Sequence, residues 1–148
     1  MSQEIESASS PEEAKKPSTF RFVDYRVYQD SKRWFQEVLS LKGLLESTPE
    51  LWNQLKANVM SVVMNITSSS TKLPLEARRY LGFSITSANK AVACLDMACD
   101  LKILTPEEFQ TLSHGFQGVI IQLKGFIKAL GVHIKARAES EKSSVLPA

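Results

Sequence analysis

Residues that could support catalysis are few in this chain, and their spacing does not favour a reactive site. A carboxylate-bridged metal centre in a helical bundle needs Glu-x-x-His pairs that project inward. The two histidines are His114 and His133, and the residues three positions before them are Thr111 and Leu130. We therefore expect no metal site, and a position on the flank of a helix accounts for His114.

The two cysteines, Cys94 and Cys99, fall within one helical pattern. At about 100° per residue they point roughly 140° apart and cannot form a disulfide within that helix. Cys94 sits mid-helix without a cationic neighbour that would lower its thiol pKa. There is no phosphate-binding glycine loop and no dinucleotide-binding fingerprint. Members of a catalytic triad can lie far apart in a chain, but the residues predict a protein that is not an enzyme and has no cofactor.

The remaining chemistry is positive charge. The formal net charge of +2 divides unevenly: residues 1–19 carry −2, residues 138–148 carry −1, and residues 20–137 carry +5. The candidate phosphate-binding residues are Lys124, Lys128, Lys135, Arg137, Arg78 and Arg79. A solvated helix surface also explains each of them. In a ring of subunits, however, a modest basic stripe would be multiplied into a patch that binds nucleic-acid backbone.

No aromatic residues interleave with these charges in the way that a base-stacking platform requires. We therefore expect any nucleic acid to be bound by its shape and backbone rather than by its sequence.

Helical periodicity predicts four long helices that position these residues. Their expected ranges are 22–46, 49–68, 74–101 and 105–137. Capping boxes precede the second at Ser47 to Glu50 and the fourth at Thr105 to Glu108. From Phe109 to Leu130 apolar residues recur at steps of three and four, which indicates a bundle seam. The predicted fold class is all-α, an antiparallel up-down four-helix bundle.

The predicted bundle domain covers residues 20–137. Residues 1–19 and 138–148 are rich in Ser, Glu, Lys and Pro, and this composition predicts disordered tails. Within the second helix, residues 59–66 are apolar nearly all round, so we expect them to be buried nearly all round. Ser61 and Asn65 are four apart and should share one face.

Two lines of residues are candidates for contacts between subunits. Val27, Trp34 and Leu41 form a heptad-spaced line that makes the apolar stripe of the first helix wider than one neighbour covers. Gly115, Gly118 and Gly125 form a nearly flat line on the last helix. Three glycines weaken a helix by about 1 kcal/mol each relative to alanine. A close neighbour would explain them, either within the chain or in another subunit.

The chain shows no secretory signal at its start and no apolar run of the roughly 18–20 residues that a membrane span needs. Two reduced thiols are typical of cytosolic proteins. We therefore expect a cytoplasmic protein with no membrane contact.

Three segments resemble a known family. Residues 22–29, FVDYRVYQ, are similar to the first-helix opening of the four-helix-bundle family that includes the 23S rRNA intervening-sequence proteins. Residues 61–66, SVVMNI, look like its Ser-Ile-x-x-Asn-Ile segment. Tyr80-Leu81 followed by SITS at 84–87 looks like its Phe-Leu-x-x-Ala-x-Gly-Ser run. The resemblance covers roughly residues 20–131.

The chain departs from the family pattern at two acidic positions. The family usually continues Ala-Glu-Gly after Asn-Ile, where this chain has Thr67-Ser68-Ser69. It also usually has Glu three residues after its Gly-Ser, where this chain has Lys90. Both changes make the corner between the second and third helices more basic, so Lys90 joins the candidate nucleic-acid-binding residues.

The resemblance implies a bundle that assembles into a ring, typically a homopentamer. A related branch comprises accessory proteins of diversity-generating retroelements, which bind a reverse transcriptase and nucleic acid. The resulting hypothesis is a non-catalytic oligomeric scaffold that binds RNA or DNA, or a nucleic-acid enzyme, through its basic surface. The alternative is an adaptor that binds only protein.

Overall fold

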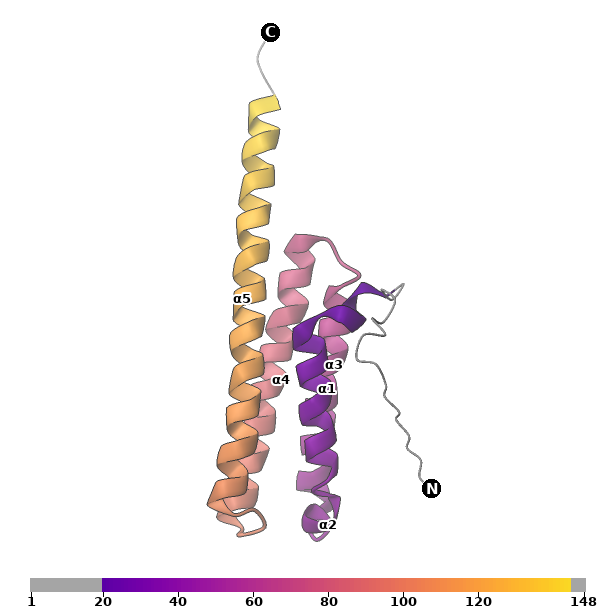
Figure 1. Ribbon diagram of the computed structural model, residues 1–148, viewed down its shortest axis with the longest axis vertical. Helices are drawn as coiled ribbons and strands as arrows, with labels where there is room; N and C mark the ends of the chain where they lie inside the picture. Colours follow the sequence, from indigo (N-terminus) through magenta and orange to yellow (C-terminus); the bar gives the residue numbers. More distant parts are fainter. Residues whose placement is uncertain (1–19, 145–148) are drawn as a thin grey trace, which may run out of the picture.

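The computed structural model describes residues 20–144, and all its regular secondary structure in that range is helical (Figure 1). The elements are the 3-10 helix η1 (Arg21–Asp24), α1 (Arg26–Leu39), α2 (Lys42–Leu45), α3 (Pro49–Ser69), α4 (Pro74–Asp100) and α5 (Pro106–Ser144). The all-α prediction is confirmed. Residues 1–19 and 145–148 lie outside the described residues, so the disorder predicted there is not addressed.

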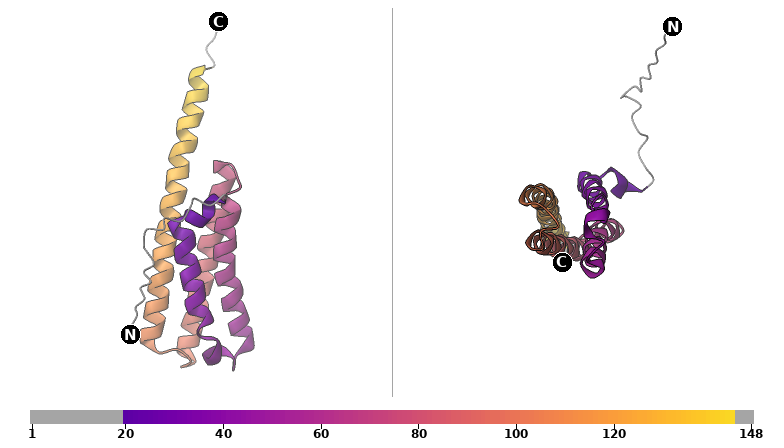
Figure 2. Two further views of the ribbon diagram at one scale, coloured as in Figure 1. Left: turned by 45° about the vertical axis from the view of Figure 1, so that its right-hand side comes forward. Right: turned by 90° about the horizontal axis from the view of Figure 1, so that it is seen from below.

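The four long helices are arranged so that each contacts two others. Helix α1 packs against α3 and α5, and α4 packs against the same two helices. Consecutive long helices run in opposite directions, as Figures 1 and 2 show. The connections are short, as expected between antiparallel neighbours.

The first predicted helix, 22–46, is interrupted twice. Tyr25 is extended (ψ 130°) and separates η1 from α1, and Leu41 leaves the helical conformation (ψ 1°) before α2. Ser40 donates a hydrogen bond from its hydroxyl to the Glu37 carbonyl at 2.6 Å. Such local bonds compete with helix continuation, and Gly43 adds little helix propensity. Helix α1 is therefore shorter than periodicity alone indicates.

The helix starts follow the predicted chemistry in part. The Thr105 N–H donates to Glu108 Oε1 at 2.8 Å, and the Glu108 N–H donates to Thr105 Oγ1 at 3.1 Å. This reciprocal pair is the capping box predicted for the last helix. The box predicted at Ser47 to Glu50 is wrong, because Thr48 is the N-cap and its hydroxyl bonds back to the Leu45 carbonyl at 3.3 Å.

The core lies where the helical seams meet. Leu112, Phe116, Val119 and Leu123 of α5 are buried, which confirms the first half of the predicted seam. Helix α4 contributes mostly small buried residues: Ala77, Ser84, Ser87, Ala88, Ala91, Cys94 and Ala98. Their small size lets α4 approach α3 closely, and Ser84 Oγ donates to the Val62 carbonyl at 2.8 Å.

Residues 59–66 are buried on one side only. Val59, Val62 and Ile66 are buried as expected, but Met60 and Met64 are 45% and 53% exposed. Because no further helix among residues 20–144 covers the outer side of α3, the expectation of burial all round is wrong. The prediction that Ser61 and Asn65 share one face is confirmed, and Asn65 Nδ2 donates a hydrogen bond of 3.0 Å to Ser61 Oγ.

Helix α5 is longer than predicted and continues to Ser144. Its C-terminal part projects past the α3–α4 connection (Figures 1 and 2). The segment after Gly131 has neither Gly nor Pro before Ser144, and Arg137 pairs with Glu141 at 3.5 Å one turn later. Such i, i+4 pairs support a helix. Residues 138–144 are therefore helical, which corrects the prediction of a disordered tail from 138.

Several residues predicted to contact another subunit are used inside the chain. Val27 and Leu41 are buried, at 4% and 7% exposure, because α3 and α5 cover the stripe on α1. Gly115 is buried too, and the ring of Trp34 occupies the place its side chain would take. Packing within the chain accounts for these four residues, and their assignment to a subunit interface stays a prediction. Gly118 and Gly125 remain exposed with open space above them.

None of the helices between residues 20 and 144 has the length and apolar character needed to cross a membrane.

Candidate nucleic-acid interface

Three lysines form an exposed row on α5. Lys124, Lys128 and Lys135 lie within about 40° of one another around the helix axis and span roughly 16 Å along it. All three are exposed. No acidic residue occurs from Phe109 to Ala138, and the first acid of α5 after the row is Glu139, one turn beyond Lys135.

Arg78 of α4 joins this row from the neighbouring helix. Its guanidinium carbon lies 3.9 Å from the position that a Cβ on Gly131 would occupy. Gly131 falls on the same side of α5 as the lysines, between Lys128 and Lys135 in the chain. The absence of a side chain at Gly131 therefore lets an exposed arginine lie against α5 in the middle of the row. We call Arg78, Lys124, Lys128 and Lys135 the basic face.

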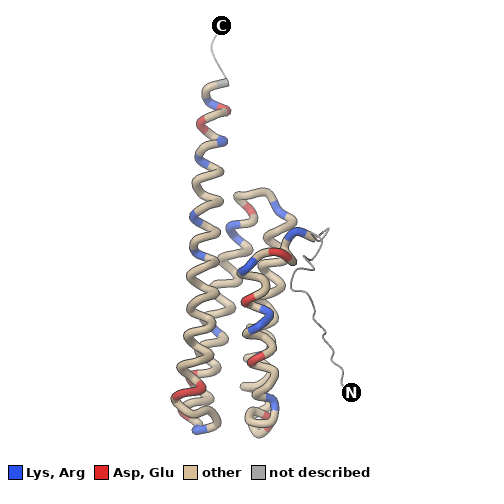
Figure 3. The backbone as a smooth tube through the Cα atoms, in the orientation of Figure 1, with Lys and Arg blue, Asp and Glu red and all other residues tan. Residues whose placement is uncertain are grey.

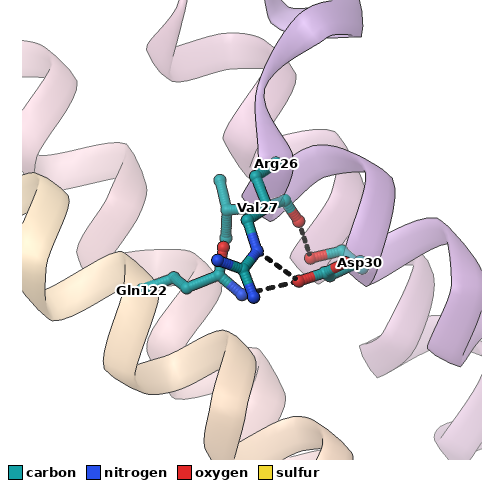
Figure 4. A network of polar contacts seen from close by, with 5 residues as sticks. Arg26, Val27, Asp30 and Gln122 are labelled. Atoms are coloured by element: carbon teal, nitrogen blue, oxygen red, sulfur yellow. Dashed lines mark hydrogen bonds and ion pairs between the residues drawn. The ribbon is translucent and has the colours of Figure 1, made fainter.

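Contacts with α1 fix which way the basic face points. Gln122 Nε2 donates to Asp30 Oδ2 at 2.7 Å, and Arg26 pairs with the same oxygen at 3.6 Å (Figure 4). The rings of Phe126 and Tyr25 lie 5.6 Å apart on the same flank of α5. Because these residues lie more than about 120° from the centre of the lysine row around α5, the row is turned away from α1, toward the edge of α4.

Three other predicted residues lie apart from the basic face. Arg137 is on the opposite side of α5 and pairs with Glu141 at 3.5 Å. Lys90 lies about 18 Å further along α4 than Arg78, in a groove of about 530 Å³ shared with Glu50 and Cys94. Arg79 diverges from Arg78 by about 100° around α4. The structure thus brings together four of the seven predicted residues.

Charge is unevenly distributed along the long axis. The acidic residues of α2 to α5 gather mainly at the end that carries α2 and the α4–α5 connection, away from the basic face (Figure 3). They are Glu46, Glu50, Asp96, Asp100, Glu107 and Glu108, with Glu46 just after α2. Between Leu51 and Leu95 the one acid is Glu76. A field of this kind attracts an anionic ligand to the opposite half of the molecule.

An aromatic cluster that the sequence analysis missed lies on α4, on the side turned away from Arg78. The rings of Tyr80 and Phe83 are 5.6 Å apart at 81°, with a cation near each of them: Lys72 at 5.4 Å from the Tyr80 ring and Arg79 at 5.5 Å from the Phe83 ring. The spacing of 79, 80 and 83 on one helix could have indicated it. The same spacing could not have indicated Lys72, because its position near the Tyr80 ring depends on the turn between α3 and α4.

Two kinds of reactive group weighed from the sequence, a metal site and an activated thiol, can be compared with the described part of the chain. Residues 20–144 hold no group of three or more His, Cys, Asp and Glu side chains placed to bind a metal. Burial raises the pKa of the Cys94 thiol, and a hydrogen bond with Asn58 opposes this shift only in part. A thiol with a raised pKa is a poor nucleophile at neutral pH.

Comparison with known proteins gives a likeness of fold. No family model matches the chain. No curated protein matches it either. The structure is similar to that of a protein of unknown function from the S23 ribosomal protein family of Bacteroides thetaiotaomicron, with a TM-score of 0.64 and 16% identity over 69% of this chain and 98% of that chain. The two proteins share a fold. This agrees, at the level of fold, with the predicted resemblance to the intervening-sequence proteins.

Proposed function

We propose that the protein is a non-catalytic four-helix bundle that binds the phosphate backbone of nucleic acid through its basic face. The observation that carries the proposal is the position of Arg78, which lies over Gly131 and adds a fourth cation to the lysine row of α5. Arginine and lysine side chains make most of the phosphate contacts in nucleic-acid complexes. Four cations on one surface, with most acidic residues of α2 to α5 at the other end of the molecule, suit that ligand.

The strength of such binding depends on salt in a calculable way. Each neutralised phosphate releases counterions, so the logarithm of affinity falls with the logarithm of salt concentration by about 0.9 per contact on duplex DNA. Full use of the basic face would give a slope of about −3.6 per subunit. A slope near zero would mean that the cations are only a solvated helix surface.

We further propose that the protein forms a homo-oligomer, a pentameric ring in keeping with the resemblance. The outer side of α5 carries Gly118 and Gly125 with open space above them, and Ile121 and Val132 at 62% and 64% exposure. Small and apolar residues together suit a close contact between helices. In a ring, the basic face would be repeated once per subunit and the attraction for a polyanion would grow accordingly.

The decisive test is fluorescence anisotropy of a labelled RNA hairpin and a DNA duplex, titrated with protein at several salt concentrations. The variant changes Lys124, Lys128 and Lys135 together to Glu. The matched control changes Lys32, Lys42 and Lys56 together to Glu, which alters the net charge equally on α1, α2 and α3. Loss of binding in the first variant and retention in the second supports the proposal. Equal behaviour of both variants contradicts it.

The alternative is an adaptor that binds protein through the uncovered side of α5, favoured by the exposure of Ile121 and Val132. A nucleic-acid enzyme such as a reverse transcriptase is a candidate partner under either proposal. Recovery of one stoichiometric partner from nuclease-treated lysate, lost on Ile121→Lys, would favour the adaptor if nucleic-acid binding is absent.

A further inference from the structure

Two aromatic rings and two cations meet at the corner between α3 and α4. Tyr80 and Phe83 are in edge-to-face contact at 5.6 Å, with Lys72 near one ring and Arg79 near the other. We call these four residues the aromatic corner. Lys72 and Arg79 are exposed, Phe83 is 42% exposed and Tyr80 is half-buried.

The two rings are not explained by packing of the core. Tyr25, Tyr28, Trp34 and Phe35 of the α1 region are partly buried and pack on the core. Tyr80 and Phe83 belong neither to the core nor to the residues packed against it. Surface apolar residues occur singly in most proteins, whereas an adjacent pair of rings with attached cations is a feature of binding surfaces.

The outer surface of α4, which carries Arg79, separates the aromatic corner from the basic face. Arg78 and Arg79 are adjacent in the chain, and their side chains diverge by about 100°, so one reaches the lysines of α5 while the other lies near Phe83. Phe83 is about 40° from Arg79 around the axis of α4 and one turn further along it. Phe83 is therefore about 140° and Tyr80 about 160° from Arg78 around α4, so a single strand that contacts the lysine row would reach the rings by passing over Arg79.

We infer that the aromatic corner binds unpaired bases of single-stranded nucleic acid. The inference rests on the proposed function and deepens it by naming the ligand class. The bases stack on Phe83 and Tyr80, while Arg79 and Lys72 contact the flanking phosphates. Every base has a face that can stack on an aromatic ring, so this mode tolerates any sequence. In a duplex those faces are covered by neighbouring base pairs, and the rings have nothing to stack on.

Lys72 and Arg79, which lie near the rings, do not prevent bases from stacking on Tyr80 and Phe83. A cation–π contact between exposed side chains is weaker than the stacking of a base on an aromatic ring. Lys72 and Arg79 have long side chains that can turn from the ring to a phosphate next to the stacked base. The free protein thus holds each cation close to the place where the bound nucleotide would need it.

The test compares one labelled 12-nucleotide single strand with the duplex of the same sequence, by anisotropy at fixed salt. Phe83→Ala should weaken binding of the single strand about tenfold, within the range of one lost stacking contact, and change duplex binding less than twofold. Phe83→Tyr retains the ring and should bind like the native protein. Phe83→Leu retains bulk without the ring and should behave like Phe83→Ala, which separates stacking from a loss of fold.

A second measurement locates the base directly. A single strand with 4-thiouridine should crosslink on irradiation to Tyr80 or Phe83, identified by mass spectrometry of the digested complex. Crosslinks that fall elsewhere, or equal weakening of single strand and duplex by Phe83→Ala, would overturn the inference and leave the basic face intact. If the native protein shows no salt-dependent binding of either the single strand or the duplex, the proposed function itself is contradicted. Binding of poly-glutamate as tight as that of the single strand would also overturn the inference, because it would assign the corner to acidic peptides.

Discussion

The ring of Trp34 on α1 lies directly on Gly115 of α5, in the place where any other residue would carry its side chain. Trp34 also lies 6.4 Å from the ring of Phe116, so its apolar surface is used within the chain. A line of glycines on a helix therefore has two different causes here: Gly115 admits a neighbour of the same chain, whereas Gly118 faces open space.

This contrast predicts opposite effects of one substitution at two sites three residues apart. Gly115→Ala should destabilise the fold by about 1–2 kcal/mol, because overpacking costs more than the gain in helix propensity. Gly118→Ala should raise the free energy of unfolding by up to about 1 kcal/mol through propensity alone. Urea denaturation of both variants measures the difference. A stabilising effect at Gly115 would mean that Trp34 is free to leave α5.

The contact of Arg78 with Gly131 predicts non-additive binding effects. Gly131→Ala should be tolerated, because its Cβ would meet the guanidinium at an ordinary 3.9 Å. Gly131→Ile should displace Arg78 and weaken nucleic-acid binding by about as much as Arg78→Ala, roughly three- to tenfold for one lost phosphate contact. The double variant should be no weaker than either single variant. Additive losses in anisotropy would show that Arg78 acts independently of its place on α5.

The sequence predicted the long helices well because periodicity is a property of the chain alone. The steps of three and four after Phe109, which is itself partly buried, correspond to buried positions from Leu112 to Leu123. The same periodicity could not say what covers a wide stripe, since Val27 and Leu41 look alike whether α3 and α5 or another subunit lies on them. The fit of Trp34 to Gly115, 81 positions apart, depends on the rotation of two helices and has no signature in the sequence.

The sequence predicted the part of the candidate site that lies on one helix and not the part that two helices form together. The lysine row follows from spacing on one helix. Its extension by Arg78 depends on the position of α4 relative to α5 along the helix axes, which the sequence does not give. Arg137 was included for its place near the end of the helix, and it lies on another side of α5, paired with Glu141. The aromatic corner was not predicted, although Tyr80 and Phe83 follow Arg79 at one and four residues, because the contact of Lys72 with the Tyr80 ring depends on the turn between α3 and α4.

Burial of Cys94 predicts a change of stability with pH. Its thiol pKa is raised in the fold, whereas in the unfolded chain it titrates near the ordinary value of about 8.5. The unfolded state therefore loses its proton first, and the free energy of unfolding should fall as pH rises above about 8.5. Below that pH the contribution of Cys94 to the free energy of unfolding does not change with pH. Cys94→Ala should show a shallower fall between about pH 8 and 10 in denaturant titrations, and identical slopes would contradict the raised pKa.

Substitution of Glu76 should increase the affinity for single-stranded nucleic acid. Glu76 is the one acid between Leu51 and Leu95, and it lies one turn of α4 before Tyr80. A carboxylate there repels the phosphates that Arg79 and Lys72 attract, so Glu76→Gln should tighten single-strand binding about two- to fivefold at low salt and less at high salt. Glu107→Gln, at the far end of the molecule, makes the same charge change and should leave binding unaltered. Equal tightening by both variants would mean that net charge alone attracts the nucleic acid, and that its position on the surface is not defined by the corner.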